Sequence, residues 1–287
     1  MSQTTFSPVA LPVWNPPEHR ALLVPPADAA RDPNSFDGRV TGAAARPAAD
    51  LEVAIPAFNE AQRLPRTLHR TIEFLQDQPW SSRIVVVDNG SSDETAEVTR
   101  TIARTTAPRV PVDLVGCSRP GKGAAVRRAL LSSRSRFVGF FDADLATPVE
   151  TLAIAMGHLG NGALAVIGSR HTSGSVFVEA QPAVRRLGGA VFRMAVRSLV
   201  QGVQDTQCGF KFFERRAVTH ALVVCRTTGF AFDVELLRQM QRDGAQIVEV
   251  PVAWSHAGAS SFRPWQDGIA SFGAVRQIQR SPRGWSS

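Results

Sequence analysis

The sequence predicts an α/β fold in which a mostly parallel central sheet is flanked by helices. Short apolar runs rich in β-branched and aromatic residues alternate with stretches whose apolar residues recur at helical spacing. The connections between them are short, as is typical of parallel sheets with right-handed crossovers. The chain has 287 residues, of which 44% are hydrophobic, and this suffices for one large domain or two small ones. We expect a single domain over residues 51–260.

The first half of the alternation is regular. Residues 51–55 alternate as a strand does, and 64–75 carry leucine and isoleucine at helical spacing. A buried strand is expected at 84–87, and the N-cap residue types at 91–93 predict the start of the next helix. Further strands are expected at 110–115, 137–141 and 163–167, separated by helices after 123 and at about 148–159.

Beyond Arg170 the pattern loosens. A polar loop is expected at 171–182, then helices at about 183–200, 214–224 and after 230, and a last strand at 247–254 whose proline suggests a sheet edge.

Two segments flank the predicted domain. Residues 1–50 contain eight of the nineteen prolines and show no apolar periodicity. Such a segment cannot bury enough surface to offset its ordering entropy, so we expect a flexible, disordered extension. Residues 261–287 are predicted to form an amphipathic C-terminal helix and a tail, because apolar residues from Trp265 to Ile278 recur at helical spacing.

Composition limits the classes of partner. The net charge is +7 and only two of the 32 basic residues are lysines, Lys122 and Lys211. A basic balance suits nucleic acid, anionic lipid or a phosphate-bearing substrate. No nucleic-acid module is recognisable and tyrosine is absent, so no nucleic-acid partner is expected. Three widely spaced cysteines, with no apolar run of membrane-spanning length and no secretory leader, predict a cytoplasmic protein.

Two carboxylates follow the central apolar strand. Asp142 and Asp144 end the stretch Phe137–Pro148, and ligands of open α/β sheets bind beyond the carboxyl ends of strands. Two acids one residue apart suit a divalent cation with oxygen ligands. The same residues would also serve as a helix cap and a solvated acid, so this stretch taken alone leaves both interpretations open.

Other polar loops are expected at the same sheet edge. Glu60 and Asp88 follow two strands, and Lys122 lies in a Gly-Lys-Gly turn that suits an anion. Each could equally be a turn or first-turn residue. Their convergence on one edge is what predicts a nucleotide-type site. His256, just after the last strand, is a candidate third metal ligand, although lone histidines are more often surface residues.

Several motifs together make the sequence recognisable. They are Ile55–Glu60, Val87–Thr95, Gly121–Val126, Asp142–Pro148, Gly168–Arg170, Asp205–Phe212, Ala231–Leu237 and Pro251–Trp254. In this order and spacing the chain resembles the family 2 glycosyltransferases of the Rossmann-like GT-A fold. Within them it is most similar to the dolichyl- (polyprenyl-) phosphate β-glucosyltransferases.

The resemblance implies roles for individual residues. Pro56, Ala57, Glu60, Asp88 and Lys122 match positions that bind the nucleotide and its diphosphate. Asp142, which also belongs to the nucleotide-binding set, and Asp144 match the acids that hold Mg²⁺ or Mn²⁺. Arg170, Gln207 and Lys211 match positions near the donor sugar and the acceptor phosphate. In one departure, Asn89 stands where the family more often has a second aspartate. In another, the membrane anchor of many relatives is not expected.

The expected reaction is inverting, metal-assisted transfer of a sugar from a nucleotide sugar, with UDP-glucose favoured, to a polyprenyl phosphate at the cytosolic membrane face. Arg170 and Lys211 would position that phosphate. The alternative is a soluble enzyme with a hydroxyl acceptor, which would need Asp205 or Asp233 as general base. A non-catalytic binder is a third hypothesis. The sequence does not indicate an oligomeric state.

Overall fold

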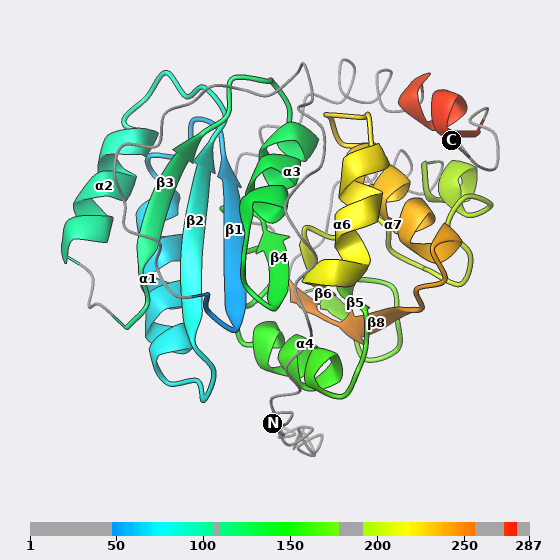
Figure 1. Ribbon diagram of the computed structural model, residues 1–287, viewed down its shortest axis with the longest axis horizontal. Coiled ribbons are helices and arrows are strands. Elements are labelled where there is room, and N and C mark those ends of the chain that lie inside the picture. Colours follow the sequence, from blue (N-terminus) through cyan, green and yellow to red (C-terminus); the bar gives the residue numbers. More distant parts are fainter. Residues whose placement is uncertain (1–47, 106–108, 178–191, 256–272, 280–287) are drawn as a thin grey trace, which may run out of the picture.

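The computed structural model describes residues 48–105, 109–177, 192–255 and 273–279 (Figure 1). The predicted N-terminal extension and His256 therefore lie outside the described residues, as does most of the predicted C-terminal helix. Residues 273–279 of that helix are described and are helical.

A seven-stranded sheet forms the centre of the fold, with the strand order β3-β2-β1-β4-β7-β5-β8. Every described pairing in it is parallel except those of β7, which runs antiparallel to both β4 and β5. The strands are β1 (Leu51–Ala57), β2 (Ser82–Asp88), β3 (Val112–Gly116), β4 (Phe137–Phe141), β5 (Ala165–Ser169), β7 (Phe210–Glu214) and β8 (Ile247–Pro251). A separate two-stranded ladder joins β6 (Val176–Phe177) to β9 (Ala253–Trp254).

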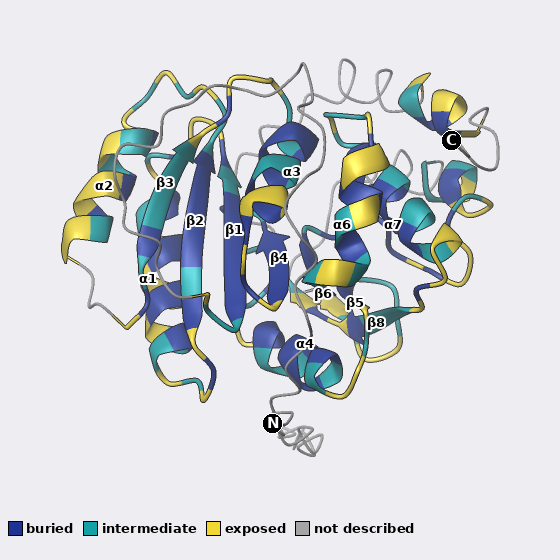
Figure 2. Cartoon of the chain, viewed as in Figure 1, coloured by how far each residue is buried: buried dark blue, intermediate teal, exposed yellow. Residues whose placement is uncertain are grey.

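Helices cover both faces of the sheet (Figure 1). They are α1 (Leu64–Gln76), α2 (Thr95–Thr105), α3 (Lys122–Ser132), α4 (Thr151–Gly160), α6 (Arg215–Val224) and α7 (Phe232–Arg242). Side chains of a strand alternate between the two faces. In β1, Val53 and Ile55 therefore join the core under α1 and α4, whereas Ala54 joins the core under α3, α6 and α7. Figure 2 shows the result: the strands are largely buried, and the exposed residues lie on the outer faces of the helices and in the loops.

The α/β fold with its mostly parallel sheet is thus confirmed. The predicted final strand divides into β8 and β9, and β8 is an edge strand, as its proline suggested. Two strands are missing from the prediction: the short β6, which lies inside the expected polar loop at 171–182, and β7. The sequence of β7, Phe-Lys-Phe-Phe-Glu, has a lysine inside an apolar run. Because a buried strand is recognised by an uninterrupted apolar run, this sequence does not predict one. No helix in the described part of the chain combines the length and the apolar character needed to cross a bilayer.

The β4–β7 pairing requires a glycine at 139. A Cβ atom there would lie 2.1 Å from the Phe212 ring, its partner in the ladder. Gly139→Ala should therefore lower the free energy of unfolding by about 1–3 kcal/mol through overpacking. Gly116→Ala in β3 is the matched control, because a Cβ atom there meets nothing within 4 Å, and it should change stability by about 0.5 kcal/mol or less. Urea denaturation measures both, and equal stabilities of the two variants would contradict this account.

Candidate active site

The carboxyl ends of β1, β2, β4 and β5 lie at one edge of the sheet because these strands run in the same direction. The loops that follow them carry the motifs singled out above. Because β7 is antiparallel, its amino end also lies at this edge, and residues 205–209 join the loops there. The predicted convergence is therefore borne out, and β7 adds a segment to it.

The first two loops are tied together by hydrogen bonds. The backbone N–H of Asn59 donates to Ser91 Oγ at 3.0 Å, and the backbone N–H of Ser92 donates to Asn59 Oδ1 at 2.8 Å. Asn59 adopts a left-handed backbone conformation, with φ of 55°, which asparagine tolerates better than most residues. Glu60 N–H donates to Thr95 Oγ1 at 2.8 Å. The two loops thus form one rigid unit, with Asp88 accepting from Ser91 N–H at 3.0 Å inside it.

Glu60 is largely buried and already paired. Its carboxylate accepts two hydrogen bonds of 2.7 Å from the Arg63 guanidinium. Burial raises the pKa of Glu60 and the Arg63 charge opposes that rise. Asp142 and Asp144 raise the Glu60 pKa further, so this carboxylate lies close enough to the acid pair to interact with it. Ala57 is buried and Pro56 is partly buried beside it.

The acid pair lies directly beyond β4. Asp142 N–H donates to Gly209 O at 3.0 Å, and Asp144 Oδ1 accepts from Ala146 N–H at 3.0 Å. Between them and the next helix, Leu145 has a positive φ of 52°, an uncommon conformation for a branched residue and one typical of functional loops. Burial raises the pKa of Asp144, and the Asp142 charge raises it further. Two carboxylates that repel each other in this way suit a shared cation.

Lys122 supplies a positive charge to this pair. Its Nζ lies 2.5 Å from Asp142 Oδ1 and 5.5 Å from the centre of the Phe140 ring. Burial alone would lower the pKa of Lys122, but Asp142 and Asp233 raise it above its ordinary value. The ammonium group therefore stays charged at the site.

Gly209 shapes the position of Asp142. A Cβ atom on residue 209 would lie 1.8 Å from Asp142 Oδ2, so only glycine lets this carboxylate adopt its place. A side chain at 209 would have to displace the acid. The sequence offered one signal for this role, the glycine within the Asp205–Phe212 motif, but the contact itself depends on β7 pairing with β4.

Lys211 lies beneath the site and does not line it. It is fully buried, and its Nζ contacts Cys208 O at 2.5 Å and Asp233 Oδ1 at 2.8 Å. In this conformation the Lys211 side chain has no exposed surface, so the predicted direct contact with an acceptor phosphate would need a change of conformation. Asp233 is only 3% exposed and is held in the same ion pair.

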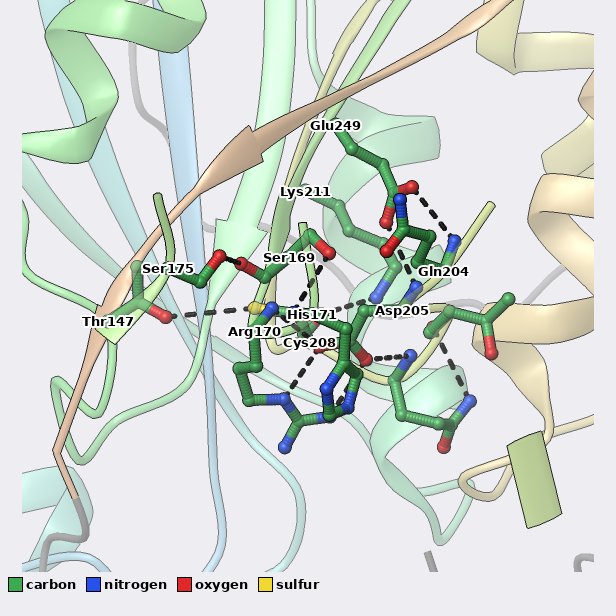
Figure 3. Close-up of polar contacts among 12 residues, drawn as sticks. Thr147, Ser169, Arg170, His171, Ser175, Gln204, Asp205, Cys208, Lys211 and Glu249 are labelled. Carbon is green, nitrogen blue, oxygen red and sulfur yellow. Dashed lines mark hydrogen bonds and ion pairs between the residues drawn. The ribbon is translucent and has the colours of Figure 1, made fainter. Parts of the chain in front are cut away.

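The Arg170 guanidinium is, with the Lys122 ammonium, a second positive charge at the site (Figure 3). Asp205 accepts from Arg170 Nε at 2.7 Å, from Nη2 at 2.8 Å and from the backbone N–H at 3.0 Å. Asp205 is fully buried. Burial by itself would raise the pKa of Asp205, but Arg170 holds it well below its usual range. The Glu249 carboxylate, which was not anticipated, anchors this segment by accepting from Gln204 N–H at 2.8 Å and Asp205 N–H at 2.9 Å.

Within the described ranges, no group of three or more histidine, cysteine, aspartate or glutamate side chains is arranged to hold a metal. Asp142 and Asp144 are brought together as predicted, whereas His256 lies outside the described residues.

An open α/β sheet with polar loops at the carboxyl ends of its strands is the architecture of a nucleotide-binding enzyme. Residues 52–232 match the family model described as glycosyl transferase family 2. The chain therefore belongs to this family and is a glycosyltransferase, which confirms the resemblance that the motifs indicated.

Curated relatives are about one third identical to this chain over the aligned residues. The dolichyl-phosphate beta-glucosyltransferase of Dictyostelium discoideum is 34% identical over 231 residues, covering 76% of this chain and 70% of the relative. The protein of the same name from Homo sapiens is 32% identical over 232 residues, covering 76% and 71%.

Solved structures confirm the fold. The glucosyl-3-phosphoglycerate synthase of Mycobacterium tuberculosis, in complex with Mn²⁺, UDP-glucose and phosphoglyceric acid, aligns with a TM-score of 0.60. The alignment covers 82% of this chain and 81% of that one at 20% identity.

The Arg170–Asp205 pair should make stability depend on pH. A carboxylate whose native pKa lies below its ordinary value stabilises the fold above that ordinary value, and this contribution is lost as pH falls. Asp205→Asn should therefore lower the free energy of unfolding by about 2–4 kcal/mol at pH 7, because it leaves Arg170 without its counter-charge. The difference in the free energy of unfolding between this variant and the unsubstituted protein should shrink as the pH falls below about 4. Chemical denaturation at several pH values measures it, and a difference independent of pH would be inconsistent with the ion pair.

Proposed function

We propose that this glycosyltransferase moves glucose from UDP-glucose to a polyprenyl phosphate, with inversion at C1. The observation that carries the proposal is the grouping of Asp142, Asp144 and Lys122 at the sheet edge that also carries the hydrogen-bonded loops after β1 and β2. The names of the curated relatives, dolichyl-phosphate beta-glucosyltransferases, support both the sugar and the acceptor.

The donor would bind across the carboxyl ends of the strands. Pro56, Ala57 and Asp88 would contact the nucleoside, and Glu60 would hold the first loop through Arg63. Lys122 would neutralise part of the diphosphate charge. Asp142 and Asp144 would hold Mg²⁺ or Mn²⁺, since carboxylate oxygens suit both ions and Asp144 is destabilised as an anion by its neighbour. When bound, such an ion stabilises the charge that develops on the leaving diphosphate.

The acceptor would be a phosphate. Both candidate bases are occupied, since Asp205 is held by Arg170 and Asp233 by Lys211. A phosphate monoester has a second pKa of about 6 and is largely dianionic at neutral pH, so it needs no strong base. Arg170 would position it, because Asp205 takes Nε and Nη2 and leaves Nη1 without a hydrogen-bond partner among the described residues. Lys211 and Asp233 would not contact the acceptor, and their buried ion pair would hold the first turn of α7 in place.

A lipid acceptor implies work at a membrane surface, and we propose peripheral contact at its cytosolic face, favoured by the net charge of +7. A soluble acceptor is the second candidate. Its support is the phosphoglyceric acid in the complex of the Mycobacterium tuberculosis synthase, whose fold this chain shares.

A panel of donors and acceptors separates these candidates. The protein is incubated with UDP-glucose or GDP-mannose, with Mg²⁺ or Mn²⁺, and with polyprenyl phosphate, phosphoglycerate or no acceptor. We expect a glucosylated polyprenyl phosphate by mass spectrometry and UDP as the second product. A glucosylated product with phosphoglycerate but not with polyprenyl phosphate would establish the soluble candidate. The absence of product with both acceptors would refute the proposed acceptor class.

The acid pair should be indispensable to turnover. Asp142→Asn and Asp144→Asn should each lower kcat by about 100-fold or more, because each would remove an anionic ligand of the Mg²⁺ or Mn²⁺ ion that stabilises the leaving diphosphate. Asp77→Asn, at an exposed position after α1, is the matched control and should retain full activity. Near-normal kcat in both site variants would exclude the assigned role.

The pH dependence of turnover should report the acceptor. If a phosphate dianion attacks, kcat should rise with pH through about 6 and then stay level to about pH 8, following the second pKa of the acceptor. Replacing the acceptor phosphate by a thiophosphate of lower pKa should move the rise to lower pH. A profile that stays in place would point to a titrating group of the protein.

A further inference from the structure

Asn89 crosslinks two loops of the site. Its Nδ2 donates to Cys117 O at 3.1 Å and to Arg119 O at 2.7 Å, while its Oδ1 accepts from Gly121 N–H at 2.8 Å. Its own backbone N–H donates to Ala57 O at 2.9 Å. The amide thus uses both kinds of hydrogen-bonding atom, and the loop between β3 and α3 is fastened to the end of β2.

Gly121 is held from the opposite side as well. It has a φ of 112°, and a Cβ atom on it would lie 2.3 Å from Thr228 O. The Ala124 N–H donates to this same Thr228 O at 3.2 Å. The residue before α3 is therefore fixed between the Asn89 side chain and the segment that precedes α7, and its backbone has little freedom to shift.

Lys122 follows directly and begins α3. Its side chain is 18% exposed, and its Nζ lies 2.5 Å from Asp142 Oδ1. Two contacts, Gly121 N–H to Asn89 Oδ1 and Lys122 Nζ to Asp142 Oδ1, therefore connect the end of β2 to the acid pair, because Gly121 and Lys122 are adjacent in the chain. Asn89, Gly121 and Lys122 all lie outside β4 and the loop after it, which carries the acids.

We propose that Asn89 is a positioning residue of the donor site, which sets the place of the Lys122 ammonium and thereby the affinity for the diphosphate of the donor. This inference rests on the proposed function, because it takes a nucleoside diphosphate as the ligand. An aspartate at 89 would keep the acceptor for Gly121 N–H. It would lose both donors and set a carboxylate oxygen against the carbonyl oxygens of Cys117 and Arg119, so the loop would move away from β2.

The test is calorimetric binding of UDP and of uridine, both in the presence of Mg²⁺. Asn89→Asp should weaken UDP binding by about tenfold and uridine binding by about twofold or less, because uridine lacks the phosphates that Lys122 would meet. Asn89→Ala, which adds no repulsion, should weaken UDP binding by a smaller factor. The control is Asn161→Asp at an exposed position after α4, which should bind UDP as the unsubstituted protein does.

A double-mutant cycle asks whether the effect passes through Lys122. In a Lys122→Met background, Asn89→Asp should weaken UDP binding by about twofold or less, since the group that it positions is gone. The same tenfold loss in both backgrounds would overturn the inference, and so would equal losses for UDP and uridine.

Folding and donor binding are controlled separately. If Asn89→Asp and Asn89→Ala both lose the thermal transition, Asn89 belongs to the fold and the inference fails. If the unsubstituted protein binds no UDP, the proposed function fails and takes this inference with it. If it binds UDP and Asn89→Asp binds equally well, only this inference fails.

Discussion

The site depends on β7, the described strand that runs against its neighbours in the main sheet. Because β7 lies between β4 and β5 in the opposite direction, its amino end enters at the edge where the parallel strands end. That geometry places Gly209 O against Asp142 N–H and brings the segment around Asp205 beside Arg170. The same strand carries Lys211 into the interior below the acids. Without the antiparallel insertion, the acid pair would have no partner on this side.

Opposite charges alternate through the site. Lys211 pairs with Asp233, and Lys122 pairs with Asp142 and is also influenced by Asp233. The two ammonium groups lie 5.6 and 5.5 Å from the centre of the Phe140 ring, whose electron-rich face attracts cations. Buried charges are costly unless each is paired, so this arrangement lets two lysines and two acids share a small volume.

The loops are held by hydrogen bonds between side chains and backbone. Asn59 and Asn89 each bridge two loops, and Glu249 and Asp205 hold the segment before β7. Because the loops are already held in place, ordering them on donor binding costs less conformational entropy. This arrangement also accounts for the asparagine at 89. Only an amide can donate to two carbonyl oxygens and accept from Gly121 at once.

The sequence by itself determined the alternation of strands and helices as far as β5, the sheet edge that carries the site, and the position of Asp142 and Asp144 at that edge. These follow from apolar periodicity and from the position of polar residues at strand ends, which are local properties of the chain. Only the tertiary structure decided that β7 enters antiparallel, that Gly209 must lack a side chain, and that Lys211 lies inside the protein. It also decided that Asp205 and Asp233 are held in ion pairs, and these pairs support the phosphate acceptor that we propose. Each of these features depends on contacts between segments that are distant in the sequence. Local spacing of residue types does not predict which distant segments come into contact.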